Sequence, residues 1–324
     1  MNNSQVEQQS LNRTKICAIV NVTPDSFSDG NKWYQTEHAV DHGIRLAKQG
    51  ADLLDLGGES TRPGSVLISS TEEIRRIEPV IKELIEKTKL PLSVDTRKAE
   101  VAEHVLDLGV NMINDISGFL GDPEMADLIA NYHSKPKFVL MFNAAIARPE
   151  HKSSQNFPNF CTKNKFKPFT PSEYMKLLEA DILDVMKYYY DKALNLAINA
   201  GVDQTQIYLD PGIGFALTEK ENLILLKNLN LIRQIGFKVF LGVSRKRFLV
   251  KTLQKNLIDS DSETSEGLLI RDQASAAITA IAATQGIEIV RTHTVNEHLI
   301  ASSIGSAIFQ ANSVENSTLG QDNN

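Results

Sequence analysis

Polar and charged side chains follow short apolar runs at regular intervals along this 324-residue chain. They are Asn21, residues 59–62, Asp95, Asn114, Asp115, Asn143, Asp210, residues 244–246 and residues 291–293. A helix cap or a loop turn would explain any one of them. Their repetition after nearly every apolar run indicates one site that uses carboxylates, amides and cations together.

Two carboxylates and an amide in this set suit a flat heterocycle. The carboxylates of Asp95 and Asp210 can each accept two N–H bonds in a fork, and Asn114 offers both a donor and an acceptor. These groups match the donor edge of an amino-pyrimidinone ring. The residue types therefore predict recognition of such a ring by its polar edge.

The cations of the set suit a phosphate or diphosphate. Arg62, Lys246 and Arg291, with His293, are groups that bind phosphate oxygens. Surface solubility would explain each cation taken singly. Arg291 and His293, however, come directly after the apolar run at 287–290, where solvation alone is a poorer explanation.

The elements that must position these residues alternate between short apolar runs and amphipathic stretches. Continuous apolar runs are typical of strands that are covered on both faces. The predicted strands are 16–22, 53–56, 92–94, 112–114, 138–141, 207–209, 239–243 and 287–290. The predicted helices are 37–49, 71–87, 97–108, 171–199, 219–234 and 272–285.

Eight strands that alternate with helices predict an α/β fold, a TIM (β/α)8 barrel in one domain. The expected barrel spans residues 15–311, with a flexible polar tail at 1–14 and another at 312–324. Polar side chains at the carboxyl ends of its strands would converge on one mouth. Residues 143–170 and 254–268 interrupt the pattern, and two interpretations stay open for them: functional lids or disordered insertions.

Composition excludes several classes of protein. The formal net charge of −6 argues against non-specific nucleic-acid binding, although local cations can still bind an anionic substrate. Cys17 and Cys161 have no metal-ligand or disulfide spacing. The first fourteen residues lack the apolar core of a secretory signal, and no run approaches the length of a membrane span. A reducing, cytoplasmic location is the resulting expectation.

Ordered motifs along the chain resemble those of the dihydropteroate synthase family. The most specific are NVTPDSFSDG at 21–30 and DLGGESTRPG at 55–64. Five shorter segments match in the same order, namely SVDT at 93–96, NDISG at 114–118, LDPG at 209–212, GVSRK at 242–246 and RTH at 291–293. The resemblance covers roughly residues 16–310.

The resemblance implies a TIM-barrel transferase of folate synthesis, usually a homodimer and a target of sulfonamides. It would condense 6-hydroxymethyl-7,8-dihydropterin pyrophosphate with p-aminobenzoate, assisted by Mg²⁺. The pterin would contact Asp95, Asn114, Met141, Asp210, Lys246 and Arg291. Asn21 would bind both the pyrophosphate and Mg²⁺. Three further residues would bind the pyrophosphate, namely Arg62, Arg291 and His293. The aminobenzoate would contact Phe27, Thr61, Pro63 and Phe215.

The chemistry expected of such a site centres on charge. Cations such as Lys246 and Arg291, together with Mg²⁺, would stabilise the departing pyrophosphate. Asp25 or Asp29, on a loop that closes over the site, would stabilise a cationic pterin methylene and help to exclude water. An aromatic amine needs positioning more than deprotonation, so no general base is assigned.

Four positions depart from the family's pattern. Phe142 and Asn143 follow Met141 where the family has His, Arg247 replaces a Ser, and Thr294 replaces an Asp. The segment 143–170 is also longer than usual. These changes lie toward the second substrate, so they predict altered affinity for p-aminobenzoate and for sulfonamides. Arg247 is interpreted as a surface charge at a helix start.

Three other hypotheses stay open. A pterin-dependent methyltransferase would need no residues that bind pyrophosphate, and the presence of Asn21, Arg62, Arg291 and His293 argues against it. A catalytically silent paralogue would bind pterin and regulate other folate enzymes. A bare scaffold barrel would leave the polar strand ends unexplained. Release of pyrophosphate on mixing both substrates with Mg²⁺ separates these hypotheses.

Overall fold

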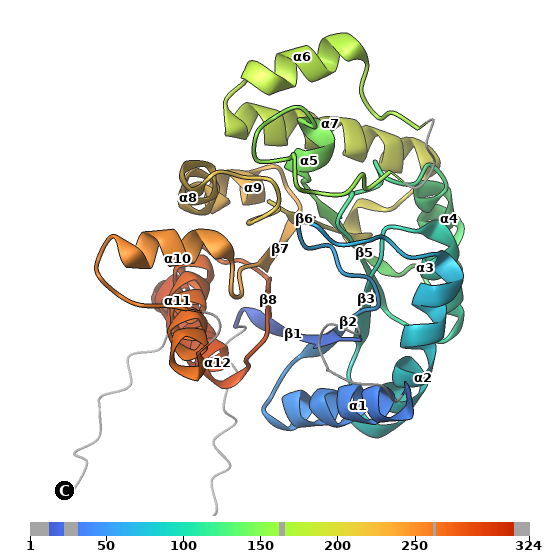
Figure 1. The fold of residues 1–324 in the computed structure, drawn as a ribbon. Helices are drawn as coiled ribbons and strands as arrows, with labels where there is room; N and C mark the ends of the chain where they lie inside the picture. Colours follow the sequence, from blue (N-terminus) through green and yellow to red (C-terminus); the bar gives the residue numbers. More distant parts are fainter. Residues whose placement is uncertain (1–12, 23–31, 162–165, 262–263, 314–324) are drawn as a thin grey trace, which may run out of the picture.

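The computed structural model describes residues 13–22, 32–161, 166–261 and 264–313 of the chain. Its parallel strands close into an eight-stranded barrel in chain order, with β8 paired to β1 (Figure 1). They are β1 (Lys15–Asn21), β2 (Leu53–Gly57), β3 (Leu92–Asp95), β4 (Met112–Asp115), β5 (Lys137–Met141), β6 (Ile207–Asp210), β7 (Lys238–Gly242) and β8 (Ile289–Thr292). The predicted TIM barrel is confirmed.

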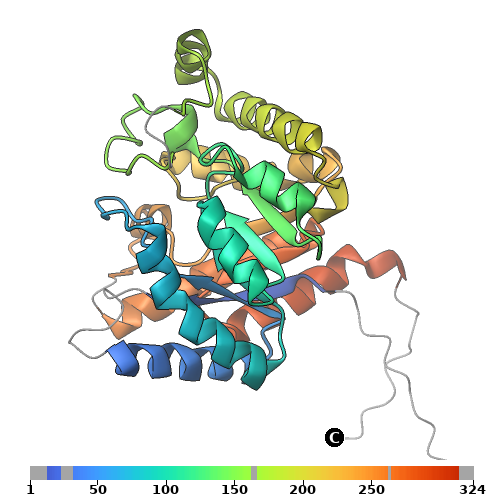
Figure 2. The ribbon, with the colours of Figure 1, turned by 90° about the vertical axis from the view of Figure 1, so that its right-hand side faces the viewer.

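Helices surround the barrel and follow its strands, as Figures 1 and 2 show from two directions. They are α1 (Lys32–Lys48), α2 (Ser70–Thr88), α3 (Ala99–Asp107), α4 (Met125–Asn131), α5 (Ala144–Ala147), α6 (Pro171–Glu179), α7 (Ile182–Ala200), α8 (Glu219–Lys227), α9 (Leu229–Gln234), α10 (Arg247–Gln254), α11 (Ser265–Thr284) and α12 (Asn296–Phe309). None of the described helices is both long and apolar enough to cross a membrane.

Successive side chains of each strand point to opposite faces of the barrel wall, and this alternation separates two apolar cores. In β1, Ile16, Ala18 and Val20 belong to the large core between the barrel and its helices. Cys17 points the other way, into a second core with one residue from each of seven strands. Successive side chains of a strand point to opposite faces, so this second core fills the barrel lumen.

One predicted strand is misplaced. Strand β8 covers Ile289–Thr292, two residues later than the predicted run at 287–290. Arg291 therefore lies inside the strand, paired in register with Gly242 and Cys17, and does not follow it. The first charged residue was taken as the end of the strand, but the lumen is polar at this level and accommodates Arg291.

Three predicted helices also need correction. The stretch 171–199 forms two helices, because Ala180 and Asp181 have extended backbone between α6 and α7. The stretch 219–234 breaks at Asn228. Helix α11 begins at Ser265, where Thr264 caps it, so it takes up part of the loop expected at 254–268. Helices α4, α5, α10 and α12 were not predicted, and α5 lies in the segment 143–170 that was expected to be a lid or a disordered insertion.

The two predicted tails lie mostly outside the described residues. Of the N-terminal one, Arg13 pairs with Asp52 at 2.7 Å, and the backbone N–H of Thr14 donates to Ser306 Oγ at 2.9 Å. These contacts attach the start of the described chain to the amino-terminal end of the barrel. The assignment of 1–14 and 312–324 as flexible tails stays a prediction.

Candidate active site

A single polar layer lies above the apolar filling of the lumen. The filling consists of Cys17, Leu53, Met112, Val139, Tyr208, Phe240 and Ile289. Two residues further along each of these strands, and on β3, stand Ile19, Asp55, Asp95, Asn114, Met141, Asp210, Gly242 and Arg291. A shift of two residues returns a strand to the same face, so all eight point into the lumen near its carboxyl-terminal mouth.

Arg291 is the centre of this layer. Its Nε donates to Asp55 Oδ2 at 2.5 Å, and its Nη2 donates to Asp95 Oδ2 at 3.0 Å. Asn114 Nδ2 also donates to Asp55 Oδ2, at 3.3 Å. One guanidinium thus bridges two carboxylates from neighbouring strands, and it neutralises charge that would otherwise repel within the barrel.

Asp55 has a role that the sequence interpretation missed. Its side chain is fully buried, and its Oδ1 has no hydrogen-bond partner within the described residues. A buried carboxylate oxygen without a partner is costly unless a ligand or water supplies a donor. The signal was present in the sequence, because a single acidic residue inside the run 53–56 cannot face an apolar core.

Burial raises the pKa of two carboxyl groups in the layer, those of Asp95 and Asp210. The pKa of Asp95 lies above its usual range because of burial, with Arg291 opposing the shift. Burial also raises the pKa of Asp210 to about 6. The hydrogen bond that its Oδ1 accepts from the Gly212 N–H, at 2.8 Å, partly offsets this rise. Perturbed carboxyl groups that converge in one cavity are typical of a functional site.

Lys246 lies beside Asp210 at the mouth. Its Nζ is 5.0 Å from the centre of the Phe215 ring. Burial lowers its pKa to about 8, and the charge of Asp210 opposes that shift. A Cβ on Gly214, where φ is +85°, would come within 2.7 Å of Lys246 Cδ, so glycine is needed for the close passage of the lysine stem.

The residues expected to bind phosphate form an outer group around the mouth. Asn21 ends β1 and is partly exposed, and Arg62 is exposed on the loop after β2. The N–H of His293 and its Nδ1 both lie near Ser244 Oγ, at 3.1 and 2.9 Å. Burial and the neighbouring arginines lower the pKa of His293, so its ring offers hydrogen bonds and no positive charge at neutral pH.

A buried ionic network holds the loop that carries Thr61, Arg62 and Pro63. Lys98 Nζ contacts Glu59 at 2.8 Å and Glu73 at 2.6 Å, and all three side chains are almost fully buried. The network members are Glu59, Glu73, Arg97 and Lys98, with Arg97 bound to Glu59 at 3.1 Å. The sequence interpretation placed Glu59 among the site residues, whereas its contacts show that it fixes the loop.

Two other strand-end residues stabilise loops. Asp115 accepts the backbone N–H groups of Ser117 and Phe119, at 2.7 and 2.9 Å. Asn143 caps α5 through the N–H of Ala145 and donates to Ile116 O, both at 2.9 Å. The alternative interpretation of such residues, a loop turn or a helix cap, is therefore correct for this pair: Asp115 stabilises a turn and Asn143 caps a helix.

The remaining sequence-predicted residues divide into three groups. Met141 lies in the lumen layer, and Thr61, Pro63 and Phe215 are partly buried on the two loops at the rim. Asp25, Phe27 and Asp29 lie outside the described residues. Of the departures from the family's pattern, Phe142 is buried against Tyr189, Arg247 is an exposed first residue of α10, and Thr294 is partly buried.

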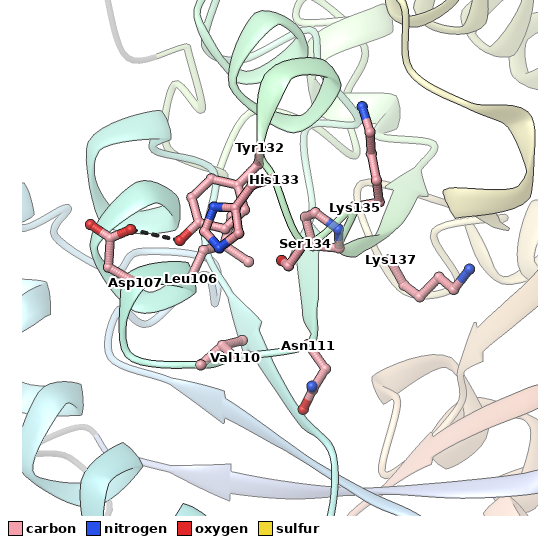
Figure 3. Close-up of a pocket in the computed structure, with 11 residues that line it drawn as sticks. Leu106, Asp107, Val110, Asn111, Tyr132, His133, Ser134, Lys135 and Lys137 are labelled. Atoms are coloured by element: carbon pink, nitrogen blue, oxygen red, sulfur yellow. Dashed lines mark hydrogen bonds between the residues drawn. The ribbon is translucent and has the colours of Figure 1, made fainter.

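A cleft of about 460 Å³ at the opposite end of the barrel is not part of this site (Figure 3). It lies where α3 leads into β4 and α4 leads into β5. Tyr132 donates to Asp107 there at 2.6 Å, while Lys135 and Lys137 donate to backbone carbonyls. These three polar side chains are paired within the protein, whereas the carboxylates and cations of the lumen layer converge at the carboxyl-terminal mouth.

Comparison with known proteins agrees with this placement. A family model described as pterin binding enzyme matches residues 17–293. A dihydropteroate synthase of Clostridium beijerinckii is 40% identical over 237 residues, which cover 73% of this chain and 76% of that protein. Its counterpart from Bacillus subtilis is 36% identical over 285 residues, covering 88% of this chain and 85% of that protein.

Solved structures show the same likeness. A dihydropteroate synthase from Clostridium difficile, solved in the presence of pteroic acid, has a TM-score of 0.75 and 35% identity over 92% of this chain and 98% of that chain. The Xanthomonas albilineans dihydropteroate synthase with 4-aminobenzoic acid has a TM-score of 0.74 and 34% identity over 94% and 95%. Together with the lumen geometry, these matches show that the chain belongs to the pterin-binding enzymes and, among them, to the dihydropteroate synthase family.

Proposed function

We propose that this chain is a dihydropteroate synthase, a transferase that joins 6-hydroxymethyl-7,8-dihydropterin pyrophosphate to p-aminobenzoate. The observation that carries the proposal is the polar lumen layer below an outer group of cations and amides. In the reaction, the bond from the pterin methylene to the diphosphate oxygen breaks, and a bond to the amine nitrogen forms. Pyrophosphate leaves with the bonding electron pair, and the amine loses a proton to solvent.

The pterin ring fits the lumen layer by its hydrogen-bond donors. Asp210 accepts the Gly212 N–H through Oδ1, and its carboxylate oxygens keep further lone pairs for the ring donors. Asp55 Oδ1 has no described partner, and Asn114 adds an amide beside it. Met141 supplies an apolar surface for the ring face. The ring is thus gripped by fixed groups on rigid strands, which positions its methylene for attack.

Arg291 acts mainly through its neighbours in this scheme. Two of its nitrogens are already committed to Asp55 and Asp95, so it pairs with these carboxylates and fixes their positions beside the ring. Arg62, Lys246 and His293 are better placed to bind the diphosphate. Negative charge grows on the departing group, and the two cations stabilise it more in the transition state than in the ground state.

A Mg²⁺ ion would bind at the mouth only together with the substrate, whose phosphate oxygens would complete its coordination. Within the described residues, no cluster of three or more His, Cys, Asp or Glu side chains could hold a metal ion. Mg²⁺ commonly binds through one or two protein oxygens, several waters and substrate phosphates. The amide oxygen of Asn21 is such a ligand, and the bound ion would neutralise diphosphate charge. Asp25 and Asp29 lie outside the described residues, and their role on a loop that closes over the site stays a prediction.

Pyrophosphate release is the decisive experiment. Purified enzyme is mixed with the pterin pyrophosphate, Mg²⁺ and varied p-aminobenzoate, and pyrophosphate is measured. Release that depends on the amine, and that stops when EDTA removes Mg²⁺, supports both the reaction and the metal. A silent pterin-binding paralogue would bind the pterin pyrophosphate in calorimetry without any release, and that result would overturn the proposal.

The pH profile of kcat/KM for the pterin substrate is expected to be bell-shaped. The carboxyl of Asp210, with a pKa of about 6, must be ionised to accept the ring donors, so activity falls as pH drops through that value. Lys246, with a pKa of about 8, must be protonated to bind diphosphate, so activity falls above pH 8. The pH profile of a Lys246→Arg variant tests the assignment of the alkaline limb to Lys246. Loss of that limb in the variant supports the assignment, and an unchanged limb contradicts it.

We also propose a homodimer formed through α11 and α12. Ile300, Ile304 and Ile308 lie one turn apart on α12 and are 60 to 69% exposed, and Ile281 on α11 is 55% exposed. A row of exposed isoleucines on two adjacent helices is typical of a subunit interface. Ile304→Glu is expected to convert a dimer to a monomer in sedimentation. A wild-type monomer would contradict the assignment.

The location in the cell is a further proposal. The cytoplasmic location inferred from composition stays a prediction, which fractionation of cells that express the chain would check.

A further inference from the structure

The long segment after α5 is attached to the loop region that follows β6. We call residues 148–160 the strap. Arg148 Nη1 contacts Glu221 Oε1 at 2.8 Å, at the start of α8. Ser153 Oγ donates to the carbonyl of Ala216 at 2.6 Å. One end of the strap is therefore fixed beside Phe215, which precedes Ala216 in the same loop.

The other end of the strap is attached on the far side of β4 and β5. The Gly64 N–H donates to Asn156 O at 2.8 Å, and Arg97 Nη1 donates to Phe160 O at 3.2 Å. Gly64 belongs to the loop of Thr61 and Pro63, and Arg97 follows β3. The strap thus joins loops from strands that are not neighbours, as the green segment after α5 in Figures 1 and 2 illustrates.

Phe157 is the side chain of the strap that faces the rim. Its ring centre is 6.1 Å from that of Phe215, with the ring planes inclined by 35°. Phe215 in turn lies 5.0 Å from Lys246 Nζ. Phe157 therefore extends a row of side chains that begins at Lys246 and continues through Phe215. It is only partly buried, so part of its surface stays available for contact.

We propose that the strap forms one wall of the aminobenzoate site and that Phe157 sets the affinity for the aromatic amine. The inference rests on the proposed function and deepens it. An aromatic ring held by neighbouring attachments offers a preformed edge or face to a second ring. The pterin groups lie in the lumen, and the strap contacts described above lie on the rim loops, so the effect is confined to the second substrate.

Steady-state kinetics of a Phe157→Ala variant test the proposal. The KM for p-aminobenzoate is expected to rise about fivefold to tenfold, the size of one lost aromatic contact. The KM for the pterin pyrophosphate is expected to stay within about twofold, because its ligands are untouched. Phe157→Tyr keeps the ring and is expected to restore the wild-type KM for the amine.

Gln155→Ala is the matched control, because Gln155 is an exposed strap residue. It is expected to leave both KM values unchanged, and melting temperatures show that each variant is folded. An unchanged KM for p-aminobenzoate in Phe157→Ala, or an equal rise in both KM values, overturns the inference. Failure of the proposed function looks different, because the wild-type enzyme itself would then release no pyrophosphate.

Discussion

Replacing Arg291 by methionine is expected to lower the free energy of unfolding by about 3 to 5 kcal/mol. The variant leaves Asp55 and Asp95 facing each other in the lumen without the guanidinium that bonds to both. Asp55 is fully buried, so water cannot replace the lost charge. Denaturant unfolding of the wild type and the variant at one pH measures the difference. Activity is expected to be lost as well, since the ring-binding carboxylates lose their arrangement.

Two further variants separate buried charge from simple truncation. Arg62→Met removes an exposed arginine at the same mouth, and its effect on stability should stay within about 0.5 kcal/mol. Adding Asp55→Asn to Arg291→Met removes one of the uncompensated charges and should recover at least about 1 kcal/mol. Equal stability losses in Arg291→Met and Arg62→Met would show that the bridge contributes nothing.

Replacing Asp210 by asparagine is expected to reduce kcat/KM for the pterin pyrophosphate by about a thousandfold. A carboxylate that accepts two N–H bonds is replaced by an amide with one acceptor, and each charge-assisted bond is worth about 1.5 to 3 kcal/mol. Stability is not expected to fall. Folding raises the pKa of this carboxyl to about 6, so its ionised form is disfavoured in the folded protein at neutral pH.

The control for Asp210 is a carboxylate far from the mouth. Asp52 accepts the Ile16 N–H at 2.7 Å at the other end of the barrel. Asp52→Asn is expected to weaken the attachment of Arg13 and leave kcat/KM unchanged. A loss of less than about tenfold in Asp210→Asn would place the ring donors elsewhere and would contradict the proposed orientation of the pterin.

Local patterning was sufficient to predict the barrel and much of its mouth. Apolar runs such as 92–94 and 207–209 are strands because both faces are covered, and Asp95 and Asp210 mark their carboxyl ends. In a closed parallel barrel, all carboxyl ends lie at one edge. Asp95, Asn114, Asp210 and Arg291 therefore converge once the strands are recognised, and the motifs independently indicated the family.

Some boundaries were wrong because a local rule was applied where tertiary structure decides. Arg291 was taken to follow its strand, since a charge usually ends an apolar run, but the lumen at that level holds Asp55 and Asp95 as partners. The break at Asp181 was missed because α6 and α7 together keep a helical apolar pattern. For Arg291 the deciding partners are distant in sequence, whereas no contact in the structure explains the break at Asp181.

The sequence by itself determined the order of the eight strands, their closure into a barrel and the types of group at the mouth. These follow from periodicity and from residue types, which are local properties. Tertiary structure alone decided that Arg291 bridges Asp55 and Asp95, that Lys98 fixes the loop after β2, and that Phe157 reaches Phe215. Such contacts join residues far apart in the chain, and they depend on strand register and loop packing, which no local pattern specifies.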